Sequence, residues 1–144
     1  MITIICVGKL KENYLKDLVD DYTKRISKYH KLNIIELKDT NINSESEEIL
    51  KYLKNDSYNI ILDIKGNSYD SVSLAKKIDN LFINYSNIVF VIGGSDGVTD
   101  EVKEKCNERL SFSLLTFPHG LFRAILLEQI YRSFKIINNE SYHK

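Results

Sequence analysis

The segment IGGSDG, from Ile92 to Gly97, has the residue types of a loop that binds a ligand through its backbone. It follows a β-branched run, and its adjacent glycines, Gly93 and Gly94, permit positive φ and a close approach of the main chain. It lacks the lysine of a phosphate loop and the glycine spacing of a dinucleotide loop. Because the loop has no basic residue, we expect a ligand without phosphates. A plain tight turn is the alternative interpretation.

The segment FSLLTF, from Phe112 to Phe117, is unusually apolar for a connection between a strand and a helix. Leu114, Leu115 and Phe117 suit a flat aromatic ligand such as adenine, whose edge would be recognised by backbone groups. A plug of the core beneath the final helix explains the same residues equally well.

One arginine occupies an unfavourable position on the final predicted helix, Gly120–Asn138. Arg123 lies within an apolar stripe and in the first turn, where the helix dipole disfavours a cation. The stripe consists of Leu127, Ile130, Phe134 and Ile137. We interpret Arg123 as a side chain placed for a ligand rather than for the fold. Snorkelling of the arginine past the helix end is the alternative.

The first two turns of this helix are apolar nearly all round. A helix of this kind must be covered on more than one side, which predicts a subunit interface. The residues that widen its apolar surface are Leu121, Phe122, Ile125 and Leu126. The opposite face carries Glu128, Arg132 and Lys135.

These segments need a scaffold, and the hydrophobic pattern predicts one by alternating between strand and helix. The predicted strands are Ile2–Gly8, Leu32–Leu37, Asn59–Ile64, Asn87–Ile92 and Arg109–Ser113. The predicted helices are Asn13–Tyr29, Ser44–Leu53, Ser73–Asn84, Asp100 to about Asn107, and Gly120–Asn138. The alternation predicts an α/β fold with a parallel sheet covered by helices on both faces. Both loops fall at the carboxyl ends of strands, where such sheets bind ligands.

Capping and turn signals define the ends of several elements. Ser44 and Glu47 have the spacing of a capping box. Thr99 is the expected N-cap of the helix that begins at Asp100. The segment KGNSYDS, Lys65–Ser71, is expected to form a turn after the third strand.

Length and composition indicate one globular domain over residues 1–144, with 43% hydrophobic and 28% charged residues. The sequence has no pattern of a signal peptide and no apolar run near the roughly 20 residues that span a bilayer, so we expect a cytoplasmic protein. Cys6 and Cys106 are expected to be separate reduced thiols, and the three scattered histidines indicate no metal site.

The formal net charge is zero, which argues against binding of nucleic acid by bulk charge. The distribution is uneven, because residues 9–31 and 109–144 are basic while residues 36–63 and 96–108 are acidic. The basic ends form one patch only if they meet in space, and solvated helix faces are the alternative.

Three segments together resemble the bacterial large-subunit ribosomal RNA pseudouridine N3-methyltransferases of the SPOUT class. They are FVIGGSDG, LSFSLLTFPHGLFRAILLEQIYRSFKI and the terminal YHK, and the N-terminal ITIICVGKLKENY fits as well. The resemblance covers nearly the whole chain. It implies a C-terminal trefoil knot, S-adenosylmethionine as cofactor, a homodimer, and methylation of N3 of a pseudouridine in 23S ribosomal RNA within the assembled ribosome.

The resemblance also implies the cofactor contacts, position by position. They are Leu62, Gly93, Phe112, Ser113, Leu114, Leu115, Thr116 and Phe117. The loop IGGSDG then needs no lysine, because S-adenosylmethionine has no phosphate and its sulfonium is cationic. The segment after the second predicted strand is shorter than expected for the family.

The implied reaction requires a uracil-type ring nitrogen to lose its proton before it attacks the methyl group. The catalytic candidates lie mostly in the C-terminal tail. His143 is a candidate base or base-orienting group, and Tyr142 is a candidate to stack on an extruded base. Arg123 and Lys144 are candidates to hold RNA phosphate or the base carbonyls. A frayed terminus is the alternative for the tail.

The final helix is about 18 residues, or roughly 27 Å, long, so it carries the tail away from the loops at its start. The tail then reaches a transfer site only by folding back or by crossing to a partner subunit. We predict a shared site, with the cofactor on one chain and the tail from the other. Two further functional classes stay open from sequence: a small-molecule methyltransferase on the same knot, and a non-enzymatic module that binds RNA or a nucleotide.

Overall fold

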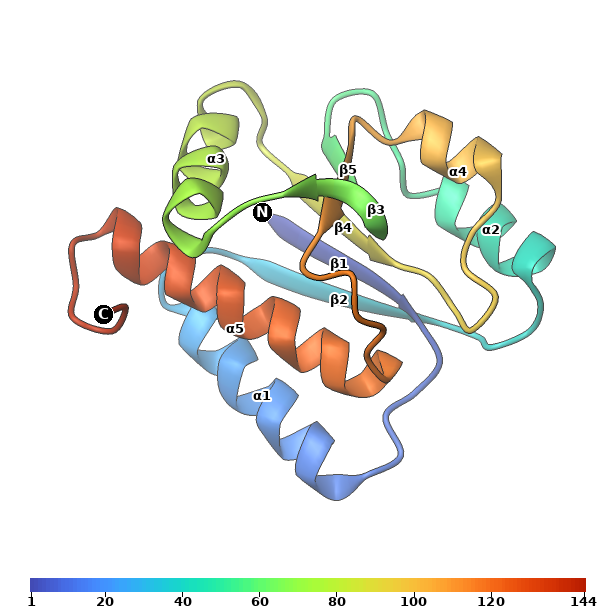
Figure 1. The fold of residues 1–144 in the computed structure, drawn as a ribbon, viewed down its shortest axis with the longest axis horizontal. Coiled ribbons are helices and arrows are strands. Elements are labelled where there is room, and N and C mark those ends of the chain that lie inside the picture. The colour runs from blue at the N-terminus through green and yellow to red at the C-terminus, as the bar shows by residue number, and fades with distance from the viewer.

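A computed structural model describes residues 1–144 and contains one sheet of five parallel strands, in the order β2-β1-β4-β3-β5 (Figure 1). The strands are β1 (Ile2–Val7), β2 (Leu32–Leu37), β3 (Tyr58–Ser68), β4 (Ile88–Ile92) and β5 (Glu108–Ser111). They alternate with α1 (Asn13–Ser27), α2 (Ile42–Leu50), α3 (Ser71–Asn84), α4 (Asp100–Lys105) and α5 (His119–Ile137). The predicted α/β fold with a parallel sheet is confirmed.

The helices cover both faces of the sheet. Helices α1, α3 and α5 lie together on one face, and α2 and α4 lie on the other (Figure 1). Alternate residues of β4 point to the two sides, so Phe90 packs under the first layer while Val89 and Val91 pack under the second. Each face therefore has its own apolar core.

The carboxyl ends of the three central strands lie at one edge. Cys6 of β1 pairs with Ile92 of β4, and Ile61 of β3 pairs with Val91. The chain leaves β1 toward β2 on one side, while β3 and β5 lie on the other side of β4. Loops that follow β1, β4 and β3 consequently diverge around this edge, which is the usual ligand-binding region of such sheets.

Two predicted helix starts were displaced by stronger caps. Helix α2 begins at Ile42 because the side chain of Asn41 accepts a hydrogen bond from the Ser44 N–H at 2.9 Å, so the predicted Ser44 capping box is wrong. Helix α3 begins two residues before the predicted Ser73, because Asp70 accepts a hydrogen bond from the Ser73 N–H at 2.7 Å. Thr99 does occupy an N-cap position, but its side chain caps nothing.

The expected turn after β3 is wrong for Lys65–Ser68, which continue the strand. Asn67 and Ser68 pair with β5 a second time after an irregularity that begins at Leu62. Gly66 makes this possible, since a Cβ there would lie 2.5 Å from the Arg109 carbonyl carbon. The two backbones touch where any other residue would separate them.

The cysteines behave as predicted. Cys6 is buried, Cys106 is half-buried, and both are free. Burial raises the pKa of each thiol to about 11, which keeps both protonated and unreactive near neutral pH. No helix has the length and apolarity to cross a bilayer. The trefoil knot stays a prediction, since strand order does not fix how the chain threads.

Candidate functional site

A cavity of about 330 Å³ opens at the carboxyl edge of the sheet, between the end of β3, the loop after β4 and the segment after β5. Seven of the eight residues expected to contact the cofactor line it: Leu62, Gly93, Phe112, Ser113, Leu115, Thr116 and Phe117. Leu114 does not, because its side chain is 85% exposed and points away from the cavity. We call this space the loop cavity.

The glycine loop, Ile92–Gly97, folds closely onto its own backbone. Gly93 and Gly94 do not use the positive φ that glycine permits, whereas Gly97 has a φ of 78°. The Gly97 N–H donates to the Gly94 carbonyl at 2.9 Å and closes a turn. A Cβ on Gly93 would lie 3.0 Å from Val98 Cγ1 and 3.1 Å from the Gly97 carbonyl carbon. The close approach that requires glycine here is made by the loop to itself.

Helix α2 braces this loop from behind. The Thr99 N–H donates to Ser46 Oγ at 3.0 Å. A Cβ on Gly94 would lie 2.6 Å from Oε1 of the buried Glu45, whose other oxygen accepts from the Thr40 N–H at 2.8 Å. The backbone that faces the loop cavity is therefore fixed by contacts outside it.

The apolar segment after β5 is held by α5 and by its own serines. Phe112 and Phe117 both pack against Phe122, with ring centroids 5.4 and 5.9 Å apart. Ser113 Oγ accepts from the Leu115 N–H at 3.0 Å. The segment thus packs against the start of α5 and also lines the loop cavity, and its binding of an aromatic ligand stays a prediction.

The charges that line the loop cavity do not favour a phosphate. Asp63 and Asp96 contribute carboxylates, and Lys103 is the single lysine. Lys103 Nζ lies 3.8 Å from an Asp63 oxygen, which offsets its charge. Apolar walls, exposed backbone and two carboxylates fit a ligand with an aromatic part and a positive charge.

Arg123 is a structural residue, which corrects its sequence interpretation. Its side chain is 3% exposed, with one guanidinium nitrogen 2.6 Å from Glu36 Oε2 and another 3.1 Å from the Gly8 carbonyl. The helix dipole's unfavourable effect is outweighed by a charged partner that the sequence places 87 residues away. Burial leaves its guanidinium only the cavity that it lines with Gly94 and Ser95, so we expect no direct contact from Arg123 to RNA.

The C-terminal tail reverses direction immediately after α5. Asn139 has φ 53°, the Glu140 N–H donates to the Lys135 carbonyl, and the Asn139 N–H donates to the Ile136 carbonyl. These two bonds and one left-handed residue form a Schellman cap. The cap turns the chain back along its own helix, and a frayed tail, the alternative from sequence, is excluded.

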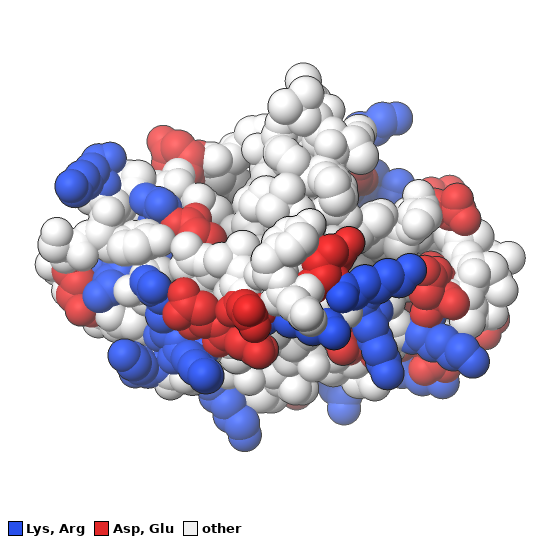
Figure 2. Space-filling view, turned by 90° about the horizontal axis from the view of Figure 1, so that it is seen from below, with Lys and Arg blue, Asp and Glu red and all other residues white.

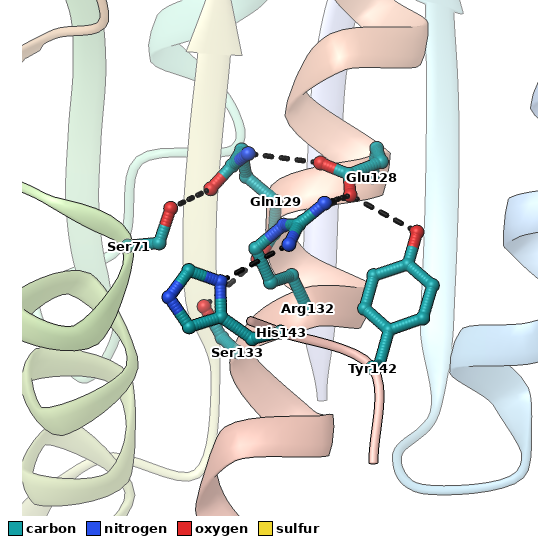
Figure 3. Close-up of polar contacts among 7 residues, drawn as sticks. All are labelled: Ser71, Glu128, Gln129, Arg132, Ser133, Tyr142 and His143. Atoms are coloured by element: carbon teal, nitrogen blue, oxygen red, sulfur yellow. Dashed lines mark hydrogen bonds and ion pairs between the residues drawn. The ribbon is translucent and has the colours of Figure 1, made fainter.

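The tail docks onto the polar face of α5 (Figure 3). Tyr142 donates to Glu128 Oε1 at 3.0 Å, and His143 Nδ1 lies 3.0 Å from an Arg132 guanidinium nitrogen. Arg132 itself contacts Glu128 Oε1 through two nitrogens, at 3.0 and 2.5 Å. Gln129 Nε2 donates to the other Glu128 oxygen at 2.8 Å. We call these five residues the tail cluster.

Tyr142 is engaged within this cluster. Its ring centroid lies 4.9 Å from that of Tyr131 and 4.8 Å from the Arg132 guanidinium carbon. Burial and the hydrogen bond to Glu128 raise the pKa of Tyr142, so its hydroxyl stays a donor. The expectation that Tyr142 stacks on a base therefore requires a change of ring contacts. Lys144 is exposed at the end of the chain.

Glu128 and Arg132 were predicted to share one helix face, but no role was expected for them or for Gln129. The available signal was the pairing of a glutamate with an arginine four residues later, next to a tail with a tyrosine and a histidine. This pairing did not indicate that the tail returns to the Glu128 turn. The return of the tail depends on the helix cap at Asn139.

A second cavity, of about 540 Å³, lies between the loop cavity and the tail cluster. It shares Leu110, Phe112 and Phe117 with the loop cavity, and Gln129 and His143 line its other side. Glu128 is nine residues from the start of α5, or about 13 Å along the helix axis. The tail folds back only this far, so the shared site between two subunits stays a prediction.

Comparison with known proteins gives one consistent result. The sequence profile of predicted SPOUT methyltransferases matches residues 1–143. The putative ribosomal RNA large subunit methyltransferase H of Methanococcus vannielii is 54% identical, and the alignment covers 99% of both chains. The ribosomal RNA large subunit methyltransferase H of Clostridium botulinum strain Eklund 17B is 49% identical with the same coverage. Both alignments extend over 157 residues against 144 here, so at least 13 positions of each relative have no counterpart.

A solved structure agrees on the fold. A probable methylase family protein from Haemophilus influenzae Rd KW20 superposes with a TM-score of 0.59 at 11% identity, over 99% of this chain and 70% of that one.

Proposed function

The chain belongs to the family of SPOUT methyltransferases, and from this premise we propose that it methylates large-subunit ribosomal RNA with S-adenosylmethionine as methyl donor. The specific target we propose is N3 of a pseudouridine in 23S ribosomal RNA, within the assembled ribosome. The observation that carries the proposal is the loop cavity, where seven of eight expected cofactor contacts come together.

The residues of the loop cavity fit S-adenosylmethionine. Phe112, Leu115 and Phe117 offer apolar walls for the adenine ring, and the fixed backbone at Gly93 offers groups for its polar edges. Asp63 and Asp96 suit a cationic ligand and disfavour a phosphate. When bound, the cofactor supplies a methyl group already activated by its sulfonium, which leaves positioning and proton removal to the protein.

The tail cluster indicates what His143 contributes. Arg132 can only donate hydrogen bonds, so a hydrogen bond at this contact requires His143 Nδ1 to accept and Nε2 to carry the ring proton. In this state His143 is a hydrogen-bond donor rather than a base. Of the two roles predicted for it, we favour the orienting one: Nε2–H donates to a carbonyl oxygen of the uracil ring as the ring becomes anionic, and the N3 proton leaves to solvent.

We further propose that the enzyme is a homodimer that packs through the first half of α5. Leu121 is 39% exposed and Phe122 and Ile125 are only half-buried, so this face retains apolar surface after folding. Leu126, which the sequence analysis placed with them, is fully buried in the chain's own core. The first turns of α5 are thus apolar all round for two reasons. One side packs into the chain's own core, and the other side is available to a second subunit.

Antiparallel packing of two α5 helices would complete the site. If the pair is centred near Ile125, the start of one helix lies opposite the Arg132 turn of its partner. The tail cluster of one subunit then faces the loop cavity of the other. A role on ribosomes also implies a cytoplasmic location.

The proposal is tested with S-adenosylmethionine that carries a labelled methyl group, ribosomes that lack the modification, and protein-free ribosomal RNA. We expect label in large-subunit RNA only when ribosomes are offered. Label in a small-molecule fraction would instead indicate a small-molecule methyltransferase. Absence of cofactor binding by calorimetry would indicate a non-enzymatic module.

A further inference from the structure

A polar groove of about 600 Å³ lies beside the proposed transfer site, on the side of the sheet edge formed by β3 and β5. The extension of β3, the start of β5, α3 and α4 all contribute to it. Its charged lining consists of four cations and one carboxylate: Lys65, Lys77, Lys103, Arg109 and Glu108. The excess of positive charge distinguishes this groove from the loop cavity.

The base of the groove is held rigidly by the one carboxylate. Glu108 is buried, and it contacts Lys77 Nζ at 2.7 Å and the hydroxyls of Tyr58 and Tyr69 at 2.9 and 2.5 Å. Burial opposes ionisation, but hydrogen bonds from Lys77 and the tyrosines keep the pKa of Glu108 below its ordinary value. The Glu108 carboxylate is thus ionised at neutral pH. Its negative charge is paired with Lys77, so it does not repel an anion that lies in the groove.

Two cations at the rim are left without a carboxylate partner. Lys65 and Arg109 are exposed, and neither forms an ion pair, whereas Lys77 and Lys103 pair with Glu108 and Asp63. The two are neighbours, because the backbone of Gly66 lies directly against that of Arg109. Both line the groove, so they present two positive charges to a ligand that lies in it.

The groove adjoins both cavities of the proposed site. Lys103 lines the groove and the loop cavity, and Tyr69 lines the groove and the cavity that contains His143. A nucleotide whose base enters the site must leave its backbone along an adjacent surface, and phosphates are held mainly by lysine and arginine. Resting on the proposed function, we propose that this groove holds backbone phosphates of the ribosomal RNA next to the methylated nucleotide.

The outer face of α1 provides a matched comparison. Figure 2 views the molecule from the side on which α1 lies, and lysines and arginines alternate there with aspartates and glutamates. Lys16 and Lys24 are exposed on this helix, near Asp17 and Asp21. These two lysines carry the same charge as Lys65 and Arg109. The cations of α1 are, however, matched by an equal number of aspartates, whereas cations outnumber carboxylates in the groove.

The experiment measures binding to purified ribosomes by co-sedimentation over a series of salt concentrations. Lys65→Ala/Arg109→Ala should weaken binding about tenfold or more near 0.1 M salt, and should reduce the slope of log affinity against log salt by about 1.5, for two lost phosphate contacts. Lys16→Ala/Lys24→Ala should bind like the wild type. Lys65→Arg/Arg109→Lys should retain most of the affinity.

Three results would overturn the groove assignment. They are wild-type affinity of the rim variant, an equal loss in the α1 variant, and lost affinity with an unchanged salt slope, which would mean that the groove contacts something uncharged. Calorimetry with S-adenosylmethionine checks that each variant is folded. Methyl transfer is measured separately, so a wild type that binds ribosomes through the rim but transfers no methyl group would refute the proposed function and leave the groove standing.

Discussion

Deletion of Tyr142, His143 and Lys144 should separate catalysis from cofactor binding. The structural cost of this deletion is limited to the contacts of the tail. The contacts that are lost are the hydrogen bonds of Tyr142 to Glu128 and of His143 to Arg132, the edge-on contact with Tyr131, and the contact of the Tyr142 ring with the Arg132 guanidinium. Because these side chains are partly exposed, the contacts are together worth about 2 kcal/mol. Against a total stability of about 5–15 kcal/mol, the truncated chain stays folded, with a melting temperature lower by roughly 4–8 °C.

The expected loss of activity is much larger than this loss of stability. Without the His143 donor that we propose, single-turnover methyl transfer to ribosomes should fall about 10²–10³-fold. Affinity for S-adenosylmethionine should change by less than about threefold, because no tail residue lines the loop cavity. A truncated chain that transfers methyl groups at the wild-type rate would refute the role given to the tail. A truncated chain that no longer binds the cofactor would refute the separation of the two sites.

Mixing two inactive chains tests whether the tail acts across the dimer. The truncated chain has an intact glycine loop, and Gly93→Val has an intact tail. Random reassociation makes half the dimers mixed, and one of the two pockets in each is complete, so about a quarter of wild-type activity should return. Mixed dimers as inactive as both parents would show that each tail serves its own chain.

The remaining predictions concern the loop, the interface and the ion pair. Gly93→Val should reduce cofactor affinity at least tenfold, since its Cβ would press on Val98 at 3.0 Å and displace the loop; calorimetry that finds unchanged affinity would place the cofactor elsewhere. Leu121→Glu should convert the dimer to a folded monomer in sedimentation at micromolar concentration, because it puts a charge on exposed apolar surface. A wild type that sediments as a monomer would contradict the dimer itself. Arg123→Met should cost about 2 kcal/mol by leaving Glu36 unpaired, and should lower the melting temperature by several degrees while ribosome affinity stays normal. An unchanged melting temperature with lost ribosome binding would restore Arg123 as an RNA contact.

The strands and the cavity were predictable because their signals are local. The run before Gly93 is β-branched and buried, and β4 begins within one residue of its predicted start. The loops at its carboxyl end follow from the rule for parallel sheets. The residues of the two loops indicated an aromatic ligand without phosphates, and the family resemblance alone implied that this ligand is S-adenosylmethionine.

The errors arose where a distant or competing partner decided the outcome. Arg123 of α5 looked misplaced because Glu36, which neutralises it, lies far away in the sequence on β2. The start of α2 was missed because Asn41 caps the helix before Ser44 does. The return of the tail depended on Asn139 adopting a left-handed conformation, which the sequence permits but does not require. In each case the structure depends on a tertiary contact or a backbone conformation that hydrophobic periodicity does not indicate.

We propose that this chain transfers a methyl group from S-adenosylmethionine to N3 of a pseudouridine in the large-subunit RNA of assembled ribosomes. It is tested most directly by incubating unmodified ribosomes with the protein and a methyl-labelled cofactor, then digesting the RNA and analysing the nucleosides by mass spectrometry. We expect one labelled nucleoside, a pseudouridine methylated on N3, from ribosomes and none from protein-free RNA. Label on another nucleoside, equal labelling of free RNA, or no label from a protein that binds the cofactor would contradict it.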